Sequence, residues 1–304
     1  AGTGYCDLAG EAHWIRAMLD EHHERAKETG ARIVHCCGFD SIPMDMGAYF
    51  LQEWAKEHHG SYCDSIALYV KATKGTASGG TLASMMNIIK EAREDRAIAK
   101  LLADPYALNP AGEREGPDGY DQRKVLYDDD VTSWTAPFVM AGINTRVVRR
   151  SHALAGYPWG RDFRYRESVL TGKGLGGRFK GMMMNLALAG LVVGVALTPT
   201  RKLLQRFFLP KPGEGPDREL QRTGFFNLVQ VGKLADGRII RTRITGDQDP
   251  GYGSTSKMLA ESAVCLARDG LTSDGGVLTP SVAMGDALLG RLRQNAGLTF
   301  DVVD

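Results

Sequence analysis

The chain has 304 residues, 43% of them hydrophobic and 24% charged, which suffices for a large buried core and for more than one domain. A formal net charge of +1 gives no reason to expect a nucleic acid as a partner. The 5 cysteines, an odd number without a CxxC pair, argue against a disulfide framework and indicate a reducing compartment.

The first predicted elements are a helix and a buried strand. Apolar side chains recur at helical spacing over residues 12–26, and Gly30 ends this helix. Residues 31–36 form a short apolar run, which predicts a strand of an α/β sheet. Such a strand needs neighbours, and one short helix is all that precedes it here, so we expect the chain to begin inside a domain.

The loop at residues 37–43 carries the clearest site signal in the chain. Gly38 permits a close approach of the backbone, and Asp40 or Ser41 is the expected N-cap of a helix that begins near Pro43. The N–H groups of this helix start would face the carboxyl edge of the sheet, where open α/β folds bind ligands and anions are favoured.

Beyond Gly60, where we expect the first domain to end, the patterns predict an α+β domain over residues 61–270. Its expected strands lie at residues 63–72, 163–170, 225–234 and 238–246, the last two as a hairpin around Asp236 and Gly237. Helices are expected at residues 82–104 and 256–269, and an exposed loop at residues 105–130. A final segment, 271–304, contains a helix near residues 284–294 that could fold back toward the first domain.

Gly172, Gly174 and Gly177 spell GxGxxG after a possible strand, the spacing of a dinucleotide fingerprint. However, no acidic residue stands ~20 positions further on, where the ribose partner would lie. An apolar run occupies that place instead. We therefore favour a flexible loop before a hydrophobic segment over a second nucleotide site.

The apolar run at residues 181–198 has 18 residues, of which Asn185 alone is strongly polar. It is nearly long enough to span a bilayer. A buried helix or helical hairpin, a surface that inserts into lipid or forms a lip for a lipid substrate, and a true span all remain open. Basic and aromatic residues in the flanks favour membrane contact over a plain core: Arg178, Lys180, Arg201, Lys202, Leu203, Leu204, Arg206, Phe207 and Phe208.

Several segments resemble the saccharopine dehydrogenase-like oxidoreductase family, which includes the trans-acting enoyl reductases of lipid biosynthesis. The first is a GTxYxDLxGE segment, here Gly2, Thr3, Tyr5, Asp7, Leu8, Gly10 and Glu11. The second is CGFDSIPxDxG, here residues 37–43 with Asp45 and Gly47. Similar segments follow over nearly the whole chain: SGGT at 78–81, PGEGP at 212–216, DPGYGST at 249–255, KMLAES at 257–262 and GGVLTP at 275–280. Saccharopine reductases proper carry a shorter form of the second segment.

The resemblance implies an α/β fold: the C-terminal remnant of a Rossmann-type parallel sheet over residues 1–60, then an α+β domain with a mostly antiparallel sheet. Family members open with a strand, a glycine-rich turn and a helix that hold a dinucleotide pyrophosphate. We therefore expect about 100 residues of a nucleotide-binding half to be absent from this chain. The implied cofactor is NADP, or NAD, with its main phosphate-binding part outside these residues, so we expect these residues alone to be inactive.

The resemblance also implies site residues. After two successive strands, the nicotinamide end of the cleft would be lined by Thr3, Gly4, Cys37, Gly38, Phe39, Asp40 and Ser41. Tyr5 and Asp7 are candidate proton donors or relays, or Tyr5 packs and Asp7 caps the following helix. Tyr252, with Lys257 nearby, is a further candidate acid, although a tight turn and a solvated helix face are favoured there. Ser78, Gly79, Gly80 and Thr81 form a turn suited to an acyl or phosphate oxygen of the substrate, or a merely structural turn.

Other chemistries find little support. His22, His23, His58 and His59 lie in charged helical contexts without metal-ligand spacing, so we expect no metal site. A GxSxG elbow and a GxxxxGK(S/T) loop are missing from the sequence, which disfavours hydrolases and kinases. We expect a cytoplasmic NAD(P)-dependent oxidoreductase acting on an enoyl or related double bond of a small-molecule or lipid-linked substrate, with a homodimer and peripheral membrane contact left open. The alternative is a non-catalytic lipid- or membrane-associated binding protein on the same fold.

Overall fold

Two β-sheets form the scaffold of the protein. The structure, a computed structural model, describes residues 2–75, 79–196, 200 and 215–303. Within these residues the first sheet, sheet A, has three parallel strands in the order β1-β2-β9. Their bounds are β1 Tyr5–Cys6, β2 Arg32–Val34 and β9 Gly276–Leu278. The predicted strand at residues 31–36 is thus confirmed as a member of a parallel sheet.

The second sheet, sheet B, has the strand order β10-β8-β7-β3-β6-β5-β4. Strands β3 and β6 pair in parallel, and the other neighbours are antiparallel, including the predicted hairpin of β7 and β8. The bounds are β3 Ser65–Lys74, β4 Leu126–Asp128, β5 Ser133–Ala136, β6 Arg164–Gly172, β7 Phe225–Lys233, β8 Ile239–Gly246 and β10 Leu298–Val303. The predicted fold class, a parallel sheet followed by a mostly antiparallel one, is confirmed.

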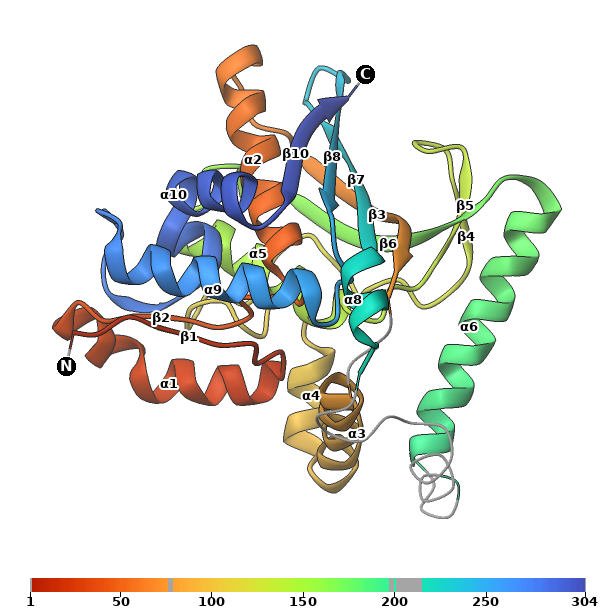
Figure 1. Ribbon diagram of the computed structural model, residues 1–304, viewed down its shortest axis with the longest axis horizontal. Helices are drawn as coiled ribbons and strands as arrows, with labels where there is room; N and C mark the ends of the chain where they lie inside the picture. Colours follow the sequence, from red (N-terminus) through yellow and green to blue (C-terminus); the bar gives the residue numbers. More distant parts are fainter. Residues whose placement is uncertain (1, 76–78, 197–199, 201–214, 304) are drawn as a thin grey trace.

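The helices cover the two sheets (Figure 1). Their bounds are α1 Ala12–Thr29, α2 Ile42–His59, α3 Gly79–Glu94, α4 Arg96–Ala103, α5 Ala141–Leu154, α6 Gly174–Ala196, α8 Arg218–Thr223, α9 Gly253–Arg268 and α10 Pro280–Asn295. Because alternate side chains of a strand point to opposite faces, Ile33 of β2 packs with α1, and its neighbour Val34 packs with the core that contains α2 and α10.

One hydrophobic core joins sheet A to sheet B. It contains Val34 of sheet A, Leu228 and Ile244 of sheet B, and Met44 and Leu51 of α2, all fully buried. Helix α2 therefore packs between the two sheets. The final segment of the chain supplies both β9 of sheet A and β10 of sheet B. The predicted domain boundaries at residues 60 and 270 stay predictions.

The single helix expected over residues 82–104 is wrong, because α3 and α4 are separate helices. Asp95 between them has an extended backbone, and its carboxylate accepts a hydrogen bond from the N–H of Ala97 at 2.7 Å. A short acidic side chain that bonds to the backbone in this way ends one helix and caps the next. The apolar spacing continues through the break and so concealed it.

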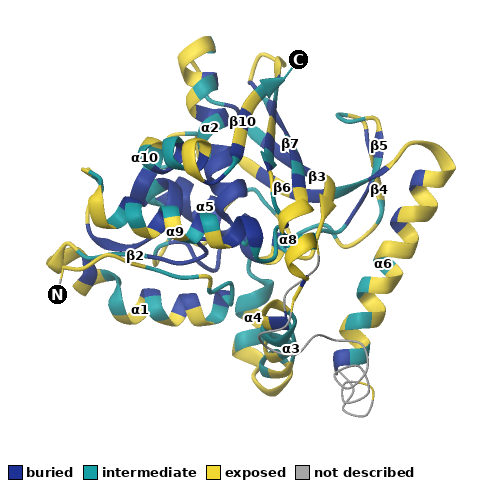
Figure 2. Cartoon of the chain, in the orientation of Figure 1, coloured by how far each residue is buried: buried dark blue, intermediate teal, exposed yellow. Residues whose placement is uncertain are grey.

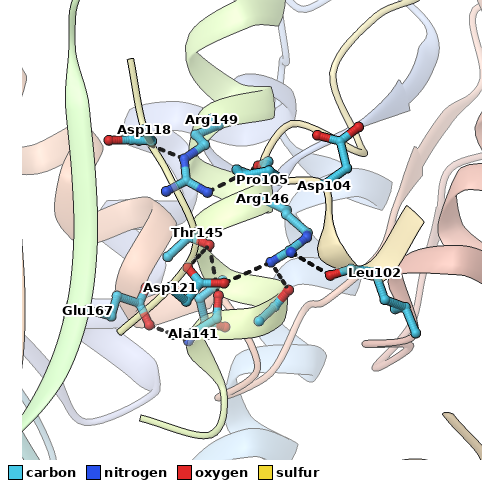
Figure 3. Close-up of polar contacts among 12 residues, drawn as sticks. Leu102, Asp104, Pro105, Asp118, Asp121, Ala141, Thr145, Arg146, Arg149 and Glu167 are labelled. Carbon is cyan, nitrogen blue, oxygen red and sulfur yellow. Dashed lines mark hydrogen bonds and ion pairs between the residues drawn. The ribbon is translucent and has the colours of Figure 1, made fainter. Parts of the chain in front are cut away.

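Residues 105–130, expected to form an exposed loop, are partly held against α5 by buried arginines (Figure 3). The Nε atom of Arg149 lies 2.7 Å from Oδ2 of Asp118, and Nη1 of Arg146 lies 3.1 Å from Oδ2 of Asp121. Arg146 also donates to the carbonyl of Leu102, and Arg149 donates to the carbonyl of Pro105. The expectation fails here because the acids of the segment find cationic partners inside the protein.

Helix α6 begins at Gly174, so the flexible loop expected at the GxGxxG spacing is wrong. It lies at the side of the molecule and exposes most of its length (Figures 1 and 2). Among the described residues, the stretch Gly174–Val195 is long and apolar enough to cross a bilayer, and 11% of its most apolar part is buried. A buried helix, one of the three options for the apolar run, is therefore excluded. Residues 201–208, with their basic and aromatic side chains, lie outside the described residues.

Gly47 of α2 offers a test of the core that the two sheets share. A Cβ atom there would lie 2.4 Å from Cδ1 of Ile244, so Gly47→Ala requires the buried Ile244 side chain or α2 to shift. We expect a loss of about 1–3 kcal/mol in the free energy of unfolding, measured by urea denaturation. The matched control is Gly290→Ala in α10, where a Cβ meets nothing within 4 Å and a gain of about 0.5–1 kcal/mol is expected. Equal effects of the two changes would contradict this packing.

Candidate active site at the carboxyl ends of β1 and β2

Three segments meet beside the carboxyl ends of two parallel strands. Residues 7–11 follow β1, residues 35–41 follow β2, and residues 249–255 lead into α9. We call this region the β1–β2 site. The carboxyl edge of a parallel sheet is where open α/β folds place their ligands, because the loops that follow the strands converge there.

Cys36 fixes the two strand-end loops against each other. Its φ of +61° is unusual for a residue other than glycine and turns the chain sharply after β2. The N–H of Cys37 then donates to the carbonyl of Asp7 at 2.8 Å, and the thiol of Cys36 donates to the carbonyl of Ala9 at 2.9 Å. Burial raises the pKa of both thiols well above the ordinary value, so both stay protonated and serve as structural groups.

Asp7 is the centre of a hydrogen-bond chain in the site. Its Oδ2 atom lies 2.8 Å from Nδ1 of His35 and accepts a hydrogen bond from the hydroxyl of Tyr5 at 3.0 Å. Its Oδ1 atom accepts the N–H of Ala9 at 2.9 Å. The N-cap of α1 is Glu11, so Asp7 does not cap that helix. The carboxylate instead links one strand-end loop to the other.

His35 is held in a nearly closed environment. Its side chain is 5% exposed and meets the ring of Trp14 edge-on, with 5.1 Å between the ring centroids. Its Nε2 atom is buried and has no hydrogen-bond partner among the described residues. A buried polar atom without a partner is uncommon in folded proteins and marks a position where a ligand or a proton could be accommodated.

The carboxyls of Asp7 and Asp40 have pKa values shifted in opposite directions. Burial acts to raise the pKa of Asp7, but the hydrogen bond and the charge of His35 outweigh it and lower the pKa below its ordinary value. Burial, and then the neighbouring carboxylate of Glu11, raise the pKa of Asp40 to about 6. Neighbouring carboxyls of this kind let a site keep one fixed negative charge and hold one exchangeable proton.

The start of α9 supports the loop after β2. The N–H of Phe39 donates to Oγ1 of Thr255 at 3.0 Å. The first amides of α9 are already occupied, because the carboxylate of Asp249 accepts the N–H groups of Tyr252 and Gly253, both at 2.9 Å. This helix start therefore positions the site loop and is not free to bind a phosphate through these amides.

The GxGxxG spacing contributes no part of this site. Gly172 ends β6 of sheet B, and Gly174 begins α6. A Cβ on Gly177 would lie 2.1 Å from the carbonyl oxygen of Gly172, so these glycines allow a strand end and a helix start to pack closely. The spacing reflects local packing in sheet B.

The residues predicted to bind the cofactor lie at both ends of sheet A. Those that follow β2 lie in the β1–β2 site, as predicted: Cys37, Gly38, Phe39, Asp40 and Ser41. Thr3 and Gly4 precede β1, so the expectation that they follow a strand is wrong. Two residues of strand are too few to produce a periodic signal, which is why this strand was not located. The role of all seven in binding a cofactor stays a prediction.

The remaining predicted residues lie around the site. Tyr252 is the N-cap residue of α9, and its ring packs against Gly215, where a Cβ would lie 2.1 Å from Cε2. Lys257 is paired with Asp247 at 2.9 Å, which supports the solvated-face interpretation. Ser78 lies outside the described residues. Gly79, Gly80 and Thr81 form the start of α3, so the turn expected at these three residues is wrong.

Helix α3 is tied directly to the loop after β1. The hydroxyl of Ser84 donates to the carboxylate of Glu11, and Oε2 of Glu91 lies 2.6 Å from Nε2 of His13. The helix that begins with Gly79, Gly80 and Thr81 is thus held beside the loop after β1. Its assignment to substrate binding stays a prediction.

His35 is the functional candidate that the sequence reasoning missed. The four histidines considered as metal ligands lie in charged helical contexts. His35 instead directly follows an apolar run and precedes Cys36 and Cys37. A polar residue at the end of a buried strand was the available signal, because strand ends at the carboxyl edge of a parallel sheet carry function.

A buried polar chain connects the site to the core of sheet B. The hydroxyl of Ser41 donates to Asn144 at 3.2 Å, and the amide of Asn144 donates to Oε2 of Glu167 at 2.9 Å. Glu167, which Figure 3 shows beside α5, also accepts the hydroxyl of Tyr165 at 3.0 Å. Burial raises the pKa of Glu167 to about 8, so its carboxyl is largely protonated at neutral pH.

The parallel sheet and the polar residues at its carboxyl edge define an α/β protein with a candidate site where open α/β sheets bind ligands. No protein-family model matches the chain. A Mycobacterium tuberculosis protein provisionally named a trans-acting enoyl reductase is 40% identical over an alignment of 308 positions. The alignment covers 96% of this chain and 72% of the relative. The trans-acting enoyl reductase of Mycobacterium bovis is 36% identical with the same coverage, and that of Mycobacterium ulcerans is 35% identical over 97% of this chain and 73% of its own length. The chain belongs to the trans-acting enoyl reductase family.

Glu167 should make the stability of the protein fall with rising pH. Its pKa is about 8 in the folded chain, above the ordinary value of a glutamate, so folding favours the protonated form. Its contribution is complete at low pH and is lost as the pH rises toward 8, at a rate on the order of 1 kcal/mol per pH unit. Urea denaturation between pH 5 and pH 8 measures it. Glu167→Gln should flatten the profile, and the exposed control Glu57→Gln should not; parallel profiles for wild type and Glu167→Gln would refute the assignment.

Proposed function

We propose that this chain is an NAD(P)H-dependent oxidoreductase of the saccharopine dehydrogenase-like group that reduces an enoyl double bond of a lipid precursor. The names of its relatives support enoyl reduction. The observation that carries the proposal is the pair of carboxyls, Asp7 and Asp40, whose pKa values shift in opposite directions at the carboxyl edge of a parallel sheet. Such an edge is where α/β folds bind dinucleotides.

The residues of the β1–β2 site fit the ring end of a dinucleotide. The partly exposed side chains of Tyr5, Leu8 and Trp14 belong to the segments around the buried pair of Asp7 and His35 and offer flat or apolar contact area. The unpartnered Nε2 atom of His35 is the kind of atom that a polar group of a ligand satisfies. Bound NAD(P)H would supply the hydride for the reduction.

Gly38 and Phe39 would shape the loop that meets this ring end. A Cβ on Gly38 would lie 2.7 Å from Cδ2 of Leu8 and 2.9 Å from Cγ2 of Thr255, so glycine is required where the loops after β1 and β2 approach each other. The N–H of Phe39 is fixed by Thr255 at 3.0 Å. The loop is therefore rigid before any ligand binds, which lowers the cost of orienting one.

Asp40 holds the proton that reduction of a double bond requires. Saturating an enoyl group adds a hydride to one carbon and a proton to its neighbour, so a donor with a pKa near the working pH is needed. With a pKa of about 6, Asp40 keeps its proton for part of the time near neutral pH, whereas Asp7 remains a carboxylate. Asp7 orients His35 and Tyr5, and the exposed hydroxyl of Tyr5 contacts the same carboxylate.

The proposal is tested with the complete natural protein, NADPH and a trans-2-enoyl thioester, with NADPH oxidation followed by absorbance. Because the reaction needs Asp40 protonated, kcat should fall as the pH rises above about 6. Asp40→Asn should lower kcat by about 10²–10⁴-fold and remove this pH dependence, since an amide holds no transferable proton. Binding of NADPH, read from its fluorescence, should change far less than kcat.

Asp162→Asn, an exposed aspartate on another turn, is the matched control and should behave as wild type. Full activity of Asp40→Asn together with inactivity of Tyr5→Phe would transfer the donor role to Tyr5 and reject the present assignment. If NADPH fluorescence does not change on mixing and no oxidation occurs, the chain is instead the non-catalytic lipid- or membrane-associated binder.

A further inference from the structure

Helix α6 presents a broad apolar surface that the described protein does not cover. Among its exposed side chains are Leu186, at 66% exposure, and Val193, at 58%. The remaining large apolar side chains exposed on this helix are Leu175, Phe179, Met182, Met183, Met184 and Val192. Figures 1 and 2 show the helix along one side of the molecule, exposed over most of its length.

A narrow stripe of α6 fixes the helix to the body of the protein. The helix packs on β5, β6 and α3. Gly177 and Gly181 are buried there, and a Cβ on Gly181 would lie 2.9 Å from Cγ1 of Val125. Asn185, on the same stripe, donates to the carbonyl of Arg123 at 3.4 Å. The only strongly polar side chain in the apolar run is therefore turned toward the protein. We call the opposite, exposed side of the helix the outward arc; it carries the apolar side chains from Met182 to Val193.

The width of this arc favours lipid over a second protein chain. A helix that meets one protein partner needs an apolar stripe about 100° wide, whereas every exposed residue of α6 after Lys180 is apolar. Its 23 residues give a length of about 35 Å, comparable to the ~30 Å hydrocarbon layer of a bilayer. An exposed apolar surface of this size marks a site of contact with a protein or a membrane.

The charges at the start of α6 are complementary to an anionic lipid surface. Lys173 directly precedes the helix, and Arg178 and Lys180 lie in its first two turns; the sequence from Gly174 to Ala196 contains no acidic residue. The guanidinium of Arg178 stacks over the ring of Trp134, 5.2 Å from its centroid. Basic residues and tryptophan are the side chains that membrane proteins place at the level of the lipid headgroups.

We propose that α6 docks this protein on a membrane that contains anionic lipids, with its outward arc in the apolar layer and its basic first turns at the headgroups. The proposal concerns a surface outside the β1–β2 site and holds whether or not the chain reduces enoyl groups. Binding then combines burial of apolar side chains with attraction between the basic turns and the headgroups.

The test is co-sedimentation of the full chain with vesicles of phosphatidylcholine alone and of phosphatidylcholine mixed with phosphatidylglycerol. Wild type should bind the mixed vesicles, more weakly at high salt, and bind pure phosphatidylcholine less. Leu186→Glu with Val193→Glu should lower the partition coefficient by at least about tenfold. Replacing Lys173, Arg178 and Lys180 by Gln should lower it by about fivefold per charge removed and abolish the preference for anionic vesicles.

The matched control places glutamates at Val139 and Ile239, which are 53% and 41% exposed on other parts of the chain and should not affect binding. Circular dichroism verifies that each variant is folded. Absence of wild-type binding, or an equal loss in the control, would overturn the proposal. So would a wild-type dimer in analytical ultracentrifugation that the α6 substitutions dissociate while vesicles bind neither form, because a second copy would then cover the arc.

Discussion

The hydrogen bond between Asp7 and His35 is the contact on which the arrangement of the site depends. Strands β1 and β2 pair in parallel with Cys6 opposite Val34. The residue that follows each strand, Asp7 after β1 and His35 after β2, therefore lies opposite the other at the carboxyl edge. A distance of 2.8 Å joins them. Because His35 is buried, loss of the carboxylate would leave its ring without a partner in a poorly solvated environment. The strand register creates the contact between Asp7 and His35, and the backbone hydrogen bond from Cys37 to Asp7 holds the two loops in place around it.

The fold could be predicted where a segment buries one face of a regular element. Residues 63–72 place Ile66, Leu68 and Val70 at alternate positions, and Asp236 with Gly237 marks a hairpin; the structure confirms both as β3 and as the β7–β8 pair. The prediction failed where tertiary partners overrode local signals. Asp118 and Asp121 look like loop residues until buried arginines of α5 pair with them. Likewise, glycines at the start of α6 indicate a loop by composition, but their small size lets the helix pack closely on a strand end.

The site was predictable in part, for a different reason. Gly38 and Asp40 lie next to a recognisable apolar strand, so their position at the carboxyl edge followed from the chain direction alone. Strand β1 contains two residues, too few for a periodic pattern, and Thr3 and Gly4 were therefore placed on the wrong side of it. His35 was missed because its importance arises from the pairing of two strands, which no single segment records. The hydrogen bonds of the site join segments that are distant in sequence. A local pattern predicts where a strand ends, but not which residue of another strand lies beside it.

Helix α3 connects the two proposals physically. On one side it is held to the loop and helix after β1 through Glu11 and His13, and on the other it packs against α6. It also carries half-buried apolar side chains, among them Met85 and Ile89. A membrane bound at α6 would therefore be held in a fixed relation to the β1–β2 site, because α3 is anchored at both. Taken together, the two proposals place an acyl tail near α6 and its reactive group near the loops after β1 and β2. This suits a substrate whose reactive group must reach a proton donor while its tail stays in an apolar environment.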